Sequence, residues 1–387
     1  MLSRYRRVAV GILLALAALR SGAFLSAGEQ GAAPLPPATD AHSLGPGFEA
    51  NLSGVLEGVR AARQARPLGT IRPEDALGHG EPIRIVSWNL MNFGDGIAAE
   101  RLKAYKSILE HMFTDIRSAK ILAVQELGSK ERGAEKFDDL LPGRDGRWNV
   151  GFGDTDDFQD NGFFTRKGIV VNCQKTLFKE GSAKSWHPAR LGHMRAGNFD
   201  FTLVTLHLAF GKDDPGRTQH EMRHVLDWLK EYLSDPKNDP DVVITGDFNL
   251  PTRKGKEQSR RSSQGKWTPL EDIIDQYPEF RSETEANGNG VRKPTALYAL
   301  VDDQTSRADG EPANNYDHFI LTGDVFDEEY VEGSAGMIPP KFIHRVEGSR
   351  DVVVSDHYPI TARFRSGGPG NNGKTILPDG PGPICEE

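Results

Sequence analysis

The sequence predicts an α/β domain in which buried strands are layered against outer helices, over residues 81–366. Apolar, β-rich runs recur along this region, at residues 83–90, 121–127, 201–208, 242–250, 318–322 and 352–364. Two segments, about 98–118 and near 218–233, instead repeat their apolar residues at helical spacing. Strands that are apolar on both faces must be covered, and amphipathic helices can cover them.

The first 28 residues have the layout of a secretory signal peptide. Arg4, Arg6 and Arg7 precede an apolar run at residues 8–19, and small residues follow it. The run is shorter than the roughly 20 residues that span a bilayer. We therefore expect removal of residues 1–28, a secreted or periplasmic protein and no stable membrane insertion afterwards. The alternative is an uncleaved, extracytoplasmic N-terminal anchor.

The flanks of the domain have little regular patterning. Residues 29–80 are rich in Gly, Pro and Ala and predict a linker, with one short amphipathic helix around residues 52–59. Residues 367–387 combine glycine, proline and asparagine and predict a disordered tail. Cys173 and Cys385 are the only two cysteines, so no disulfide framework holds the fold. Whether these two pair or stay free is open at this point.

Overall charge limits the partners. The 387 residues carry a formal net charge of −8, which argues against general electrostatic attraction to nucleic acid. It does not exclude a nuclease, because a local basic patch and bound cations can serve the same purpose. The chain has neither the glycine-rich loop that binds nucleoside triphosphates nor the Gly-x-Ser-x-Gly turn of serine hydrolases.

Polar residues gather where the predicted strands end. Each core strand is apolar until its C-terminal end, which then supplies Asn89, Glu126, His207, Asp247 with Asn249, or Asp356 with His357. In α/β proteins this edge of the sheet holds the ligand. Acid and amide oxygens without a Cys/His cluster suit Mg²⁺ or Mn²⁺ better than zinc. Two histidines add positive charge or acid–base function, which predicts metal-assisted hydrolysis of a phosphoester.

Six short segments resemble, in order, the signature blocks of the endonuclease/exonuclease/phosphatase superfamily. They are Trp88-Asn89, Gln125-Glu126, Leu206-His207-Leu208, Gly246-Asp247-Phe248-Asn249, Tyr316-Asp317-His318 and Ser355-Asp356-His357. The resemblance covers about residues 82–365. It implies a four-layer α/β sandwich, with two facing mixed β-sheets and helices outside.

The same resemblance implies roles for individual residues. Glu126 would bind the metal, with Asn89 and Asp356 as further ligands or water holders. Asp317 would orient and charge His357, and this pair would activate water or stabilise the phosphate.

Further roles follow from the same blocks. Asp247 would handle a proton or position the nucleophile, and Asn249 would hold a phosphate oxygen. His207 matches a histidine of the DNase I-like and sphingomyelinase-like branches. Arg190 is the expected phosphate-contacting arginine, with Arg195 as its rival. The family's tyrosine before residues 163–166 is absent here, where the sequence at residues 156–160 is acidic.

These features make a DNase I-like endonuclease the leading hypothesis, with nucleic acid as substrate and a monomer as the expected state. Six cations follow Asn249 and could track a phosphate backbone: Arg253, Lys254, Lys256, Arg260, Arg261 and Lys266. A merely solvated loop is the alternative. A phosphoinositide phosphatase or a sphingomyelinase-like phosphodiesterase is the second hypothesis, and a catalytically silent binding domain is the third. Asp302-Asp303 and Asp213-Asp214 could hold a structural Ca²⁺.

Overall fold

The computed structural model describes residues 82–94, 96–115, 119–128, 130–142, 149–152, 160–178, 188–211, 215–258, 267–281, 293–308, 311–338 and 354–367. All of them belong to one compact unit, Arg66–Glu387. The predicted signal peptide, the linker and all but the first residue of the predicted tail lie outside these residues. Their predictions therefore stay as they stand.

The first of two large sheets has six strands and is mixed. Its two central strands, Ile83–Phe93 (β1) and Ala119–Leu127 (β2), are parallel, while their outer neighbours run antiparallel to them. The strand order is β13-β14-β1-β2-β4-β3. The outer strands are Gly336–Met337 (β13), Ile360–Phe364 (β14), Asp160–Thr165 (β4) and Asn149–Phe152 (β3).

The second sheet is also mixed and six-stranded, in the order β5-β6-β7-β8-β12-β9. Phe199–His207 (β7) and Val242–Asp247 (β8) form its parallel central pair. The remaining strands are Ile169–Leu177 (β5), Ala189–Ala196 (β6), Asp317–Thr322 (β12) and Leu297–Leu300 (β9). A separate antiparallel pair joins Ser306–Ala308 (β10) to Glu311–Asn314 (β11).

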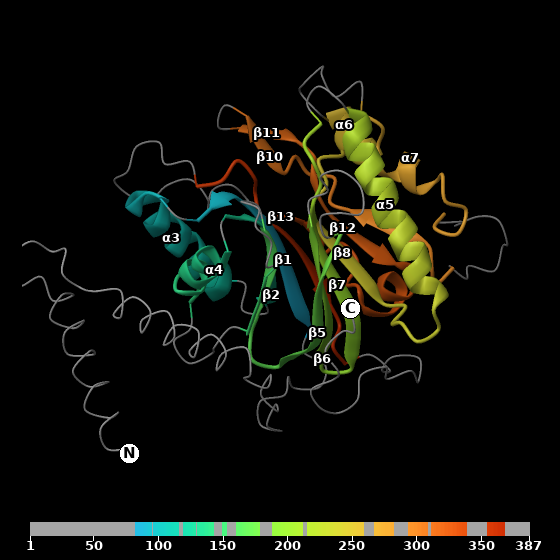
Figure 1. The fold of residues 1–387 in the computed structure, drawn as a ribbon, viewed down its shortest axis with the longest axis horizontal. Helices are drawn as coiled ribbons and strands as arrows, with labels where there is room; N and C mark the ends of the chain where they lie inside the picture. Colours follow the sequence, from blue (N-terminus) through green and yellow to red (C-terminus); the bar gives the residue numbers. More distant parts are fainter. Residues whose placement is uncertain are drawn as a thin grey trace, which may run out of the picture. The chain divides into compact units, whose positions relative to one another are not determined.

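Helices cover the outer face of each sheet, so the unit has four layers. Ala99–Asp115 (α3) and Lys130–Asp138 (α4) lie over the first sheet, at the left of Figure 1. Pro215–Ser234 (α5) and Leu270–Ile274 (α7) lie over the second sheet, at the right. Arg253–Gln258 (α6) and the π-helix Val325–Glu329 (η3) are shorter connections. The predicted α/β sandwich of two facing mixed sheets with helices outside is confirmed.

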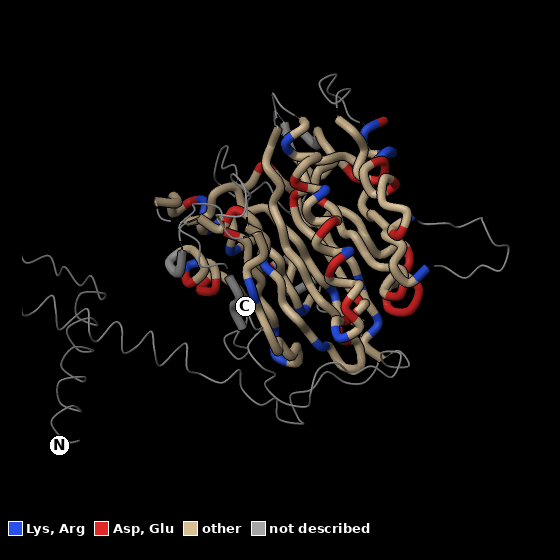
Figure 2. Tube along the Cα trace, turned by 45° about the vertical axis from the view of Figure 1, so that its right-hand side comes forward, with Lys and Arg blue, Asp and Glu red and all other residues tan. Residues whose placement is uncertain are grey.

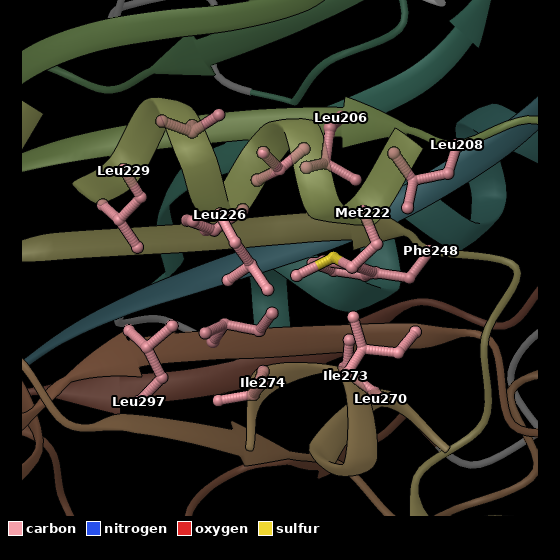
Figure 3. Packing of buried hydrophobic residues seen from close by; sticks show 14 of the residues in the cluster. Leu206, Leu208, Met222, Leu226, Leu229, Phe248, Leu270, Ile273, Ile274 and Leu297 are labelled. Carbon is pink, nitrogen blue, oxygen red and sulfur yellow. The ribbon is translucent and has the colours of Figure 1, made fainter. Parts of the chain in front are cut away.

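The helices are held by apolar stripes at helical spacing. Met222, Leu226 and Leu229 of α5 point onto the second sheet, where they meet Leu206 of β7 and Phe248 (Figure 3). Ile273 and the other apolar residues of α7 close the same cluster from the side. Each fully buried side chain of this size contributes about 1.5–3 kcal/mol. The periodicity near residues 218–233 therefore predicted α5 correctly, although the helix starts slightly earlier.

The two sheets face each other across a third apolar cluster. Every second residue of a strand lies on the same face of its sheet. Ile83 and Ile85 of β1 therefore share the inward face, where they pack in one cluster with Phe201 and Leu203 of β7. The intervening residues of β1, such as Trp88, point outward to α3. The strands bury apolar residues on both faces, as the continuous apolar runs predicted.

Charged residues lie mainly outside this core. Figure 2 shows blue and red segments concentrated on the helices and connections, while long stretches of the sheets are tan. No helix among the described residues is long and apolar enough to cross a membrane. Cys173, in β5, is disulfide-bonded, and Cys385 lies outside the described residues.

Candidate active site

Strand alternation explains how polar side chains reach one end of the space between the sheets. In β1 the inward series that begins with Ile83 and Ile85 continues with Ser87 and Asn89, all buried. In β7 the same face carries Phe201 and Leu203, and then Thr205 and His207. The apolar half of each strand thus fills the core, and the polar half lines a site at the strand ends.

Neighbouring strands of the second sheet complete this lining. In β8 the inward residue Val243 is followed by Thr245 and Asp247, and in β12 Asp317 begins the inward series. Asp247 is the direct cross-strand partner of both His207 and Asp317. Three candidate catalytic side chains therefore lie next to one another because of strand register alone.

Glu126 reaches the site through an irregularity in β2. The outward-facing series Leu122 and Val124 would place Glu126 toward α3. Its φ of 56° and a register shift in this part of the strand break the alternation. Such backbone conformations cost about 1–3 kcal/mol and collect at functional sites. Asn249, with a φ of 51°, is a second candidate residue held in this region.

One asparagine joins the two sheets at the site. Asn89 Nδ2 donates to Glu126 Oε1 over 2.9 Å and to Asp247 Oδ2 over 3.0 Å. The backbone N–H of Asn92 donates to the other oxygen of Glu126 over 2.9 Å. His207 Nε2 lies 3.7 Å from Glu126 Oε1 and 3.6 Å from Asp247 Oδ2. Two carboxylates from opposite sheets thus converge on shared donors.

The second histidine forms a chain with two aspartates. His357 donates from Nδ1 to Asp317 Oδ2 over 2.7 Å. Its Nε2 then lies 3.4 Å from Asp247 Oδ2. Asp317 therefore fixes the ring orientation and directs Nε2 toward Asp247. The side chains of Asp317, His357 and Asp247 are all buried.

Burial and neighbouring charges set the proton affinities in this chain. Burial raises the pKa of Asp247 to about 6, opposed by the positive charge of His357. Burial by itself lowers the pKa of His357, but the charges of Asp317 and Asp247 outweigh it and raise that pKa well above its usual value. The charges of Asp317 and Asp247 therefore favour the protonated form of His357. A protonated Nε2 is a donor suited to a phosphate oxygen.

Non-catalytic residues of the same segments hold these groups in place. Trp88 Nε1 donates to the carbonyl of His357 over 3.1 Å. Ser355 Oγ donates to the carbonyl of Asn89 over 2.7 Å and accepts from the N–H of His357 over 3.0 Å. Thr305 Oγ1 accepts from the N–H of Asp317 over 2.9 Å. Trp88 and Ser355 belong to the sequence motifs without a predicted role of their own, and nothing in the sequence singled out Thr305.

Below the site, a buried glutamine connects the sheets. Gln125 Nε2 donates to Ser87 Oγ over 3.1 Å and to Thr205 Oγ1 over 2.8 Å, from one sheet to the other. A glycine in β8 allows this strand to approach β7 closely. Gly246 has a φ of 143°, and a Cβ there would lie 1.9 Å from the carbonyl oxygen of Leu206. Sequence reasoning assigned no role to either residue.

The remaining predicted site residues lie around this cluster. Asn249 donates its N–H to Asp247 Oδ1 over 2.9 Å and its Nδ2 to the carbonyl of Leu208. Asp356 is exposed, and its charge contributes to the raised pKa of His357. Arg190 donates to Thr176 Oγ1 and Gln174 Oε1 of β5, on the side of β6 away from β7. Its hydrogen bonds therefore do not join it to the cluster.

Half of the predicted basic stretch is already paired. Arg253 forms ion pairs with Asp272 (2.6 Å) and with Asp275. Lys254 forms one with Asp302 over 2.9 Å, and Lys256 Nζ donates to the carbonyl of Trp267. Arg260, Arg261 and Lys266 lie outside the described residues. Each described cation of this stretch thus has a partner within the protein, and the ion pairs of Arg253 and Lys254 lie at the exposed surface.

The carboxylates of the site fit a hard cation. Glu126 converges on the same donors as Asp247. Asp247, Asp317 and His357 also have ligand atoms within 4.8 Å of one another, but the hydrogen bond between His357 Nδ1 and Asp317 occupies that pair. Carboxylate-rich sets of this kind suit Mg²⁺ and Mn²⁺. Asn89 fixes the carboxylates with its nitrogen, and its Oδ1 accepts from the N–H of Met91. Of the Ca²⁺ candidates, Asp302 and Asp303 accept hydrogen bonds from Thr252, Lys254 and Met337; Asp213 and Asp214 lie outside the described residues.

Comparison with known proteins shows which solved structures share this fold. No protein-family model matches the chain, and no curated protein matches it in sequence. Solved structures do. A protein of the endonuclease/exonuclease/phosphatase family from Bacteroides thetaiotaomicron superposes with a TM-score of 0.51 at 14% identity, over 74% of this chain and 96% of that one.

Two further structures give lower scores. A mannosyl-6-phosphatase from Bacteroides thetaiotaomicron matches with a TM-score of 0.48 at 14% identity, over 73% of this chain and 99% of its own. TDP2 from D. rerio, complexed with a single-strand DNA product, matches with a TM-score of 0.46 at 15% identity, over 73% and 99%.

The chain therefore has the fold of the endonuclease/exonuclease/phosphatase proteins, as the resemblance implied. At 14% identity the likeness establishes the fold, and the activity has to be argued from the side chains of the site.

Proposed function

We propose that the protein is a divalent-metal-dependent phosphoesterase, and specifically a DNase I-like endonuclease that hydrolyses a phosphodiester with water. One observation carries the proposal: the buried chain Asp317–His357–Asp247, which meets Glu126 and His207 at the ends of two facing sheets. Two histidines and three carboxylates that converge at the strand ends of both sheets are typical of a functional site rather than of a structural core.

The geometry favours a division of labour within the chain. Asp317 orients His357, whose Nε2–H donates to a non-bridging phosphate oxygen and stabilises the added negative charge. Asp247 lies between the two histidines and accepts the proton of the attacking water. Asn249 lies beside Asp247, where its side chain borders the phosphate.

Glu126 is the first residue that we assign to the metal. Asp356 is the exposed carboxylate next to the site. Asn89 fixes both Glu126 and Asp247 through its hydrogen bonds. A bound Mg²⁺ or Mn²⁺ supplies Lewis-acid neutralisation of the phosphate. The hydrogen bonds from Asn89 and Asn92 hold both oxygens of Glu126 in a fixed orientation, which lowers the reorganisation needed for binding.

The decisive test is nicking of supercoiled plasmid by the purified protein with Mg²⁺, with Mn²⁺ and with EDTA. We expect nicking that EDTA abolishes and that His357→Ala lowers by about 10²- to 10⁴-fold, the range typical of a lost acid–base or charge-stabilising group. His220→Ala is a matched control, because His220 is an exposed histidine of α5 outside the chain of contacts.

The second hypothesis is tested on the same preparation. Inositol phosphates, phosphoinositides and sphingomyelin would be assayed in parallel. Release of phosphate or phosphocholine without plasmid nicking would overturn the endonuclease while keeping the phosphoesterase. A silent binding domain would have lost a catalytic group; instead Glu126, Asp247, Asp317 and His357 are all present, with His357 in contact with both aspartates and Asn89 joining Glu126 to Asp247.

We further propose that the protein works outside the cytoplasm as a monomer. The signal-like residues 1–28 motivate this, and the disulfide at Cys173 supports it, because disulfides persist in oxidising compartments. N-terminal sequencing of protein from the periplasm or medium would find a start near residue 29. A full-length cytoplasmic protein would contradict export.

A further inference from the structure

An exposed phenylalanine lies in the segment that directly follows β7, the strand that ends at His207. Phe210 is 54% exposed and is the single large apolar side chain classed as exposed among the described residues. It follows His207 by three residues. Isolated exposed apolar residues are common on proteins, so its exposure alone decides nothing. Its surroundings make it different from an isolated residue.

Two other aromatic rings contact the ring of Phe210. Its ring is stacked on that of Trp267, with centroids 6.3 Å apart and an interplanar angle of 19°. It meets Tyr316 edge-on at 6.2 Å, and Trp267 lies 6.4 Å from Tyr316. Trp267 and Tyr316 are only 5% and 6% exposed. We call these three residues the aromatic platform, of which Phe210 is the accessible top.

The platform is built from segments that also hold the catalytic groups. Tyr316 immediately precedes Asp317. The carbonyl of Tyr316 accepts from the N–H of Phe248, and the carbonyl of Asp247 accepts from the N–H of Leu208. Phe210 is thus connected through a short, hydrogen-bonded path to Asp247 and His207. Phe210 therefore lies at the end of β7 that also carries His207, at the edge of the sheet where Asp247 ends β8.

The backbone on both sides of Phe210 is fixed by α5. The N–H of Ala209 donates to Glu221 Oε2 over 2.6 Å, and the carbonyl of Ala209 accepts from Thr218 Oγ1 over 2.6 Å. Thr218 Oγ1 also accepts from the N–H of Gly211 over 3.2 Å. Thr218 and Glu221 are both buried. An exposed ring on an ordered backbone binds a partner with little loss of conformational entropy.

We propose that Phe210, supported by Trp267 and Tyr316, stacks on a nucleobase next to the scissile phosphate and determines specificity for nucleic acid. This inference rests on the proposed endonuclease function and names the part of the substrate that is recognised. Stacking on an aromatic side chain serves any base, because every base has a flat face. Arg253 and Lys254 are ion-paired within the protein, so base stacking supplies a contact with nucleic acid that does not depend on these cations.

The test compares cleavage of one oligonucleotide with cleavage of versions in which single bases flanking the cut are replaced by a tetrahydrofuran abasic analogue. For the wild-type protein we expect kcat/KM to fall about 5- to 150-fold at one flanking position, the range that corresponds to loss of one stacked base. Phe210→Leu should abolish this sensitivity, giving a ratio near one. Phe210→Tyr keeps the ring and should restore the wild-type ratio.

A ratio of two rates measured on one preparation is insensitive to partial unfolding of a variant. Phe326→Leu, the same substitution at a partly buried ring of η3, is the matched control and should show the wild-type ratio. Equal sensitivity to the abasic analogue in Phe210→Leu and wild type would overturn the inference. So would a wild-type protein that nicks plasmid but is indifferent to every missing base; the endonuclease would stand in both cases.

Two other outcomes also reject the inference. If the wild-type protein cleaves no nucleic acid but hydrolyses another phosphoester, both the inference and the proposed endonuclease fail. If Phe210→Leu keeps its base sensitivity but no longer sediments with phosphatidylcholine vesicles that wild type binds, Phe210 contacts lipid instead.

Discussion

At the residue scale, the candidate site depends on which atom of each side chain faces the substrate. Asp317 determines this for His357, because it accepts from Nδ1 and leaves Nε2 for Asp247 and the phosphate. Asn89 does the same for Glu126 and Asp247 with its amide nitrogen. Residue identity alone gives the kind of chemistry, and these hydrogen bonds give its direction.

Replacing Asp317 should therefore lower turnover more than substrate binding. In Asp317→Asn, we expect kcat to fall about 10²- to 10⁴-fold with little change in KM, since the orienting acceptor and its charge are lost. The charge of Asp317 raises the pKa of His357. Without it, His357 loses its proton at lower pH, so the alkaline limb of the kcat–pH profile should shift toward lower pH.

The exposed acid of η3, Asp327, provides the matched variant Asp327→Asn, which should leave both kcat and the pH profile as in wild type. A profile of Asp317→Asn that keeps the wild-type alkaline limb would show that Asp317 does not act through His357.

At the element scale, β8 joins two very different environments. Its C-terminal end carries Asp247 in the site, and its N-terminal end follows the buried acids Asp239 and Asp241. Glu329 of η3 is also buried there, and Asp200, Asp324, Glu328 and the hydroxyl of Tyr232 face the same acids. Burial is the largest cause of a raised pKa in each of these groups, and repulsion from the neighbouring acids adds to it. The pKa rises to about 8 for Asp239, to about 7 for Asp241 and to about 9 for Glu329.

These raised values predict a protein that loses stability as the pH rises. Between about pH 4 and the folded pKa values, the folded state holds protons that the unfolded state releases. The stabilisation is complete below the unfolded pKa values and is lost as pH rises through about 7 to 9. We expect the melting temperature to fall steadily from pH 5 to pH 9.

The triple variant Asp239→Asn, Asp241→Asn, Glu329→Gln should have a flatter profile and should be more stable than wild type at pH 9, by an amount on the order of a few kcal/mol, because each pKa unit corresponds to about 1.4 kcal/mol. Thermal melts monitored by circular dichroism over this pH range would measure it. An unchanged slope in the variant would mean that other groups cause the dependence.

At the scale of the whole molecule, the site exists only where the two sheets meet. Asn89, Gln125 and Glu126 come from the first sheet, whereas His207, Asp247 and Asp317 come from the second. Gln125 and Asn89 bridge them directly. A cation held by Glu126 near Asp247 should therefore tie the two sheets together and stabilise the entire fold.

Mg²⁺ or Mn²⁺ should raise the melting temperature of EDTA-treated protein by several degrees. A ligand at 100 times its dissociation constant stabilises the folded state by about 2.7 kcal/mol. Glu126→Gln should lose the shift. No shift in wild type, or the same shift in Glu126→Gln, would contradict the assignment of Glu126 to the metal without any measurement of activity.

The sequence was informative where local composition controls structure. The central strands β1, β2, β7, β8 and β12 and the helices α3 and α5 lie where apolar runs and helical spacing predicted them. The structure adds β5 and β6, which the sequence did not predict. Both are partly exposed and mix polar residues with apolar ones, and β5, which carries Gln174 and Lys175, is the edge strand of its sheet. The run predicted at 352–364 begins as a strand only at Ile360 within its described part.

Sequence alone determined the fold class and the kinds of residue at the site, because buried apolar strands that end in acids, amides and imidazoles are a local pattern. Tertiary structure decided which of those residues touch. The positive φ of Glu126, the turn of Arg190 toward β5, the pairing of Arg253 with Asp272 and Asp275, and the exposure of Phe210 on Trp267 all depend on it. These contacts join residues distant in sequence, and their geometry follows from strand register and backbone conformation, which local composition does not encode.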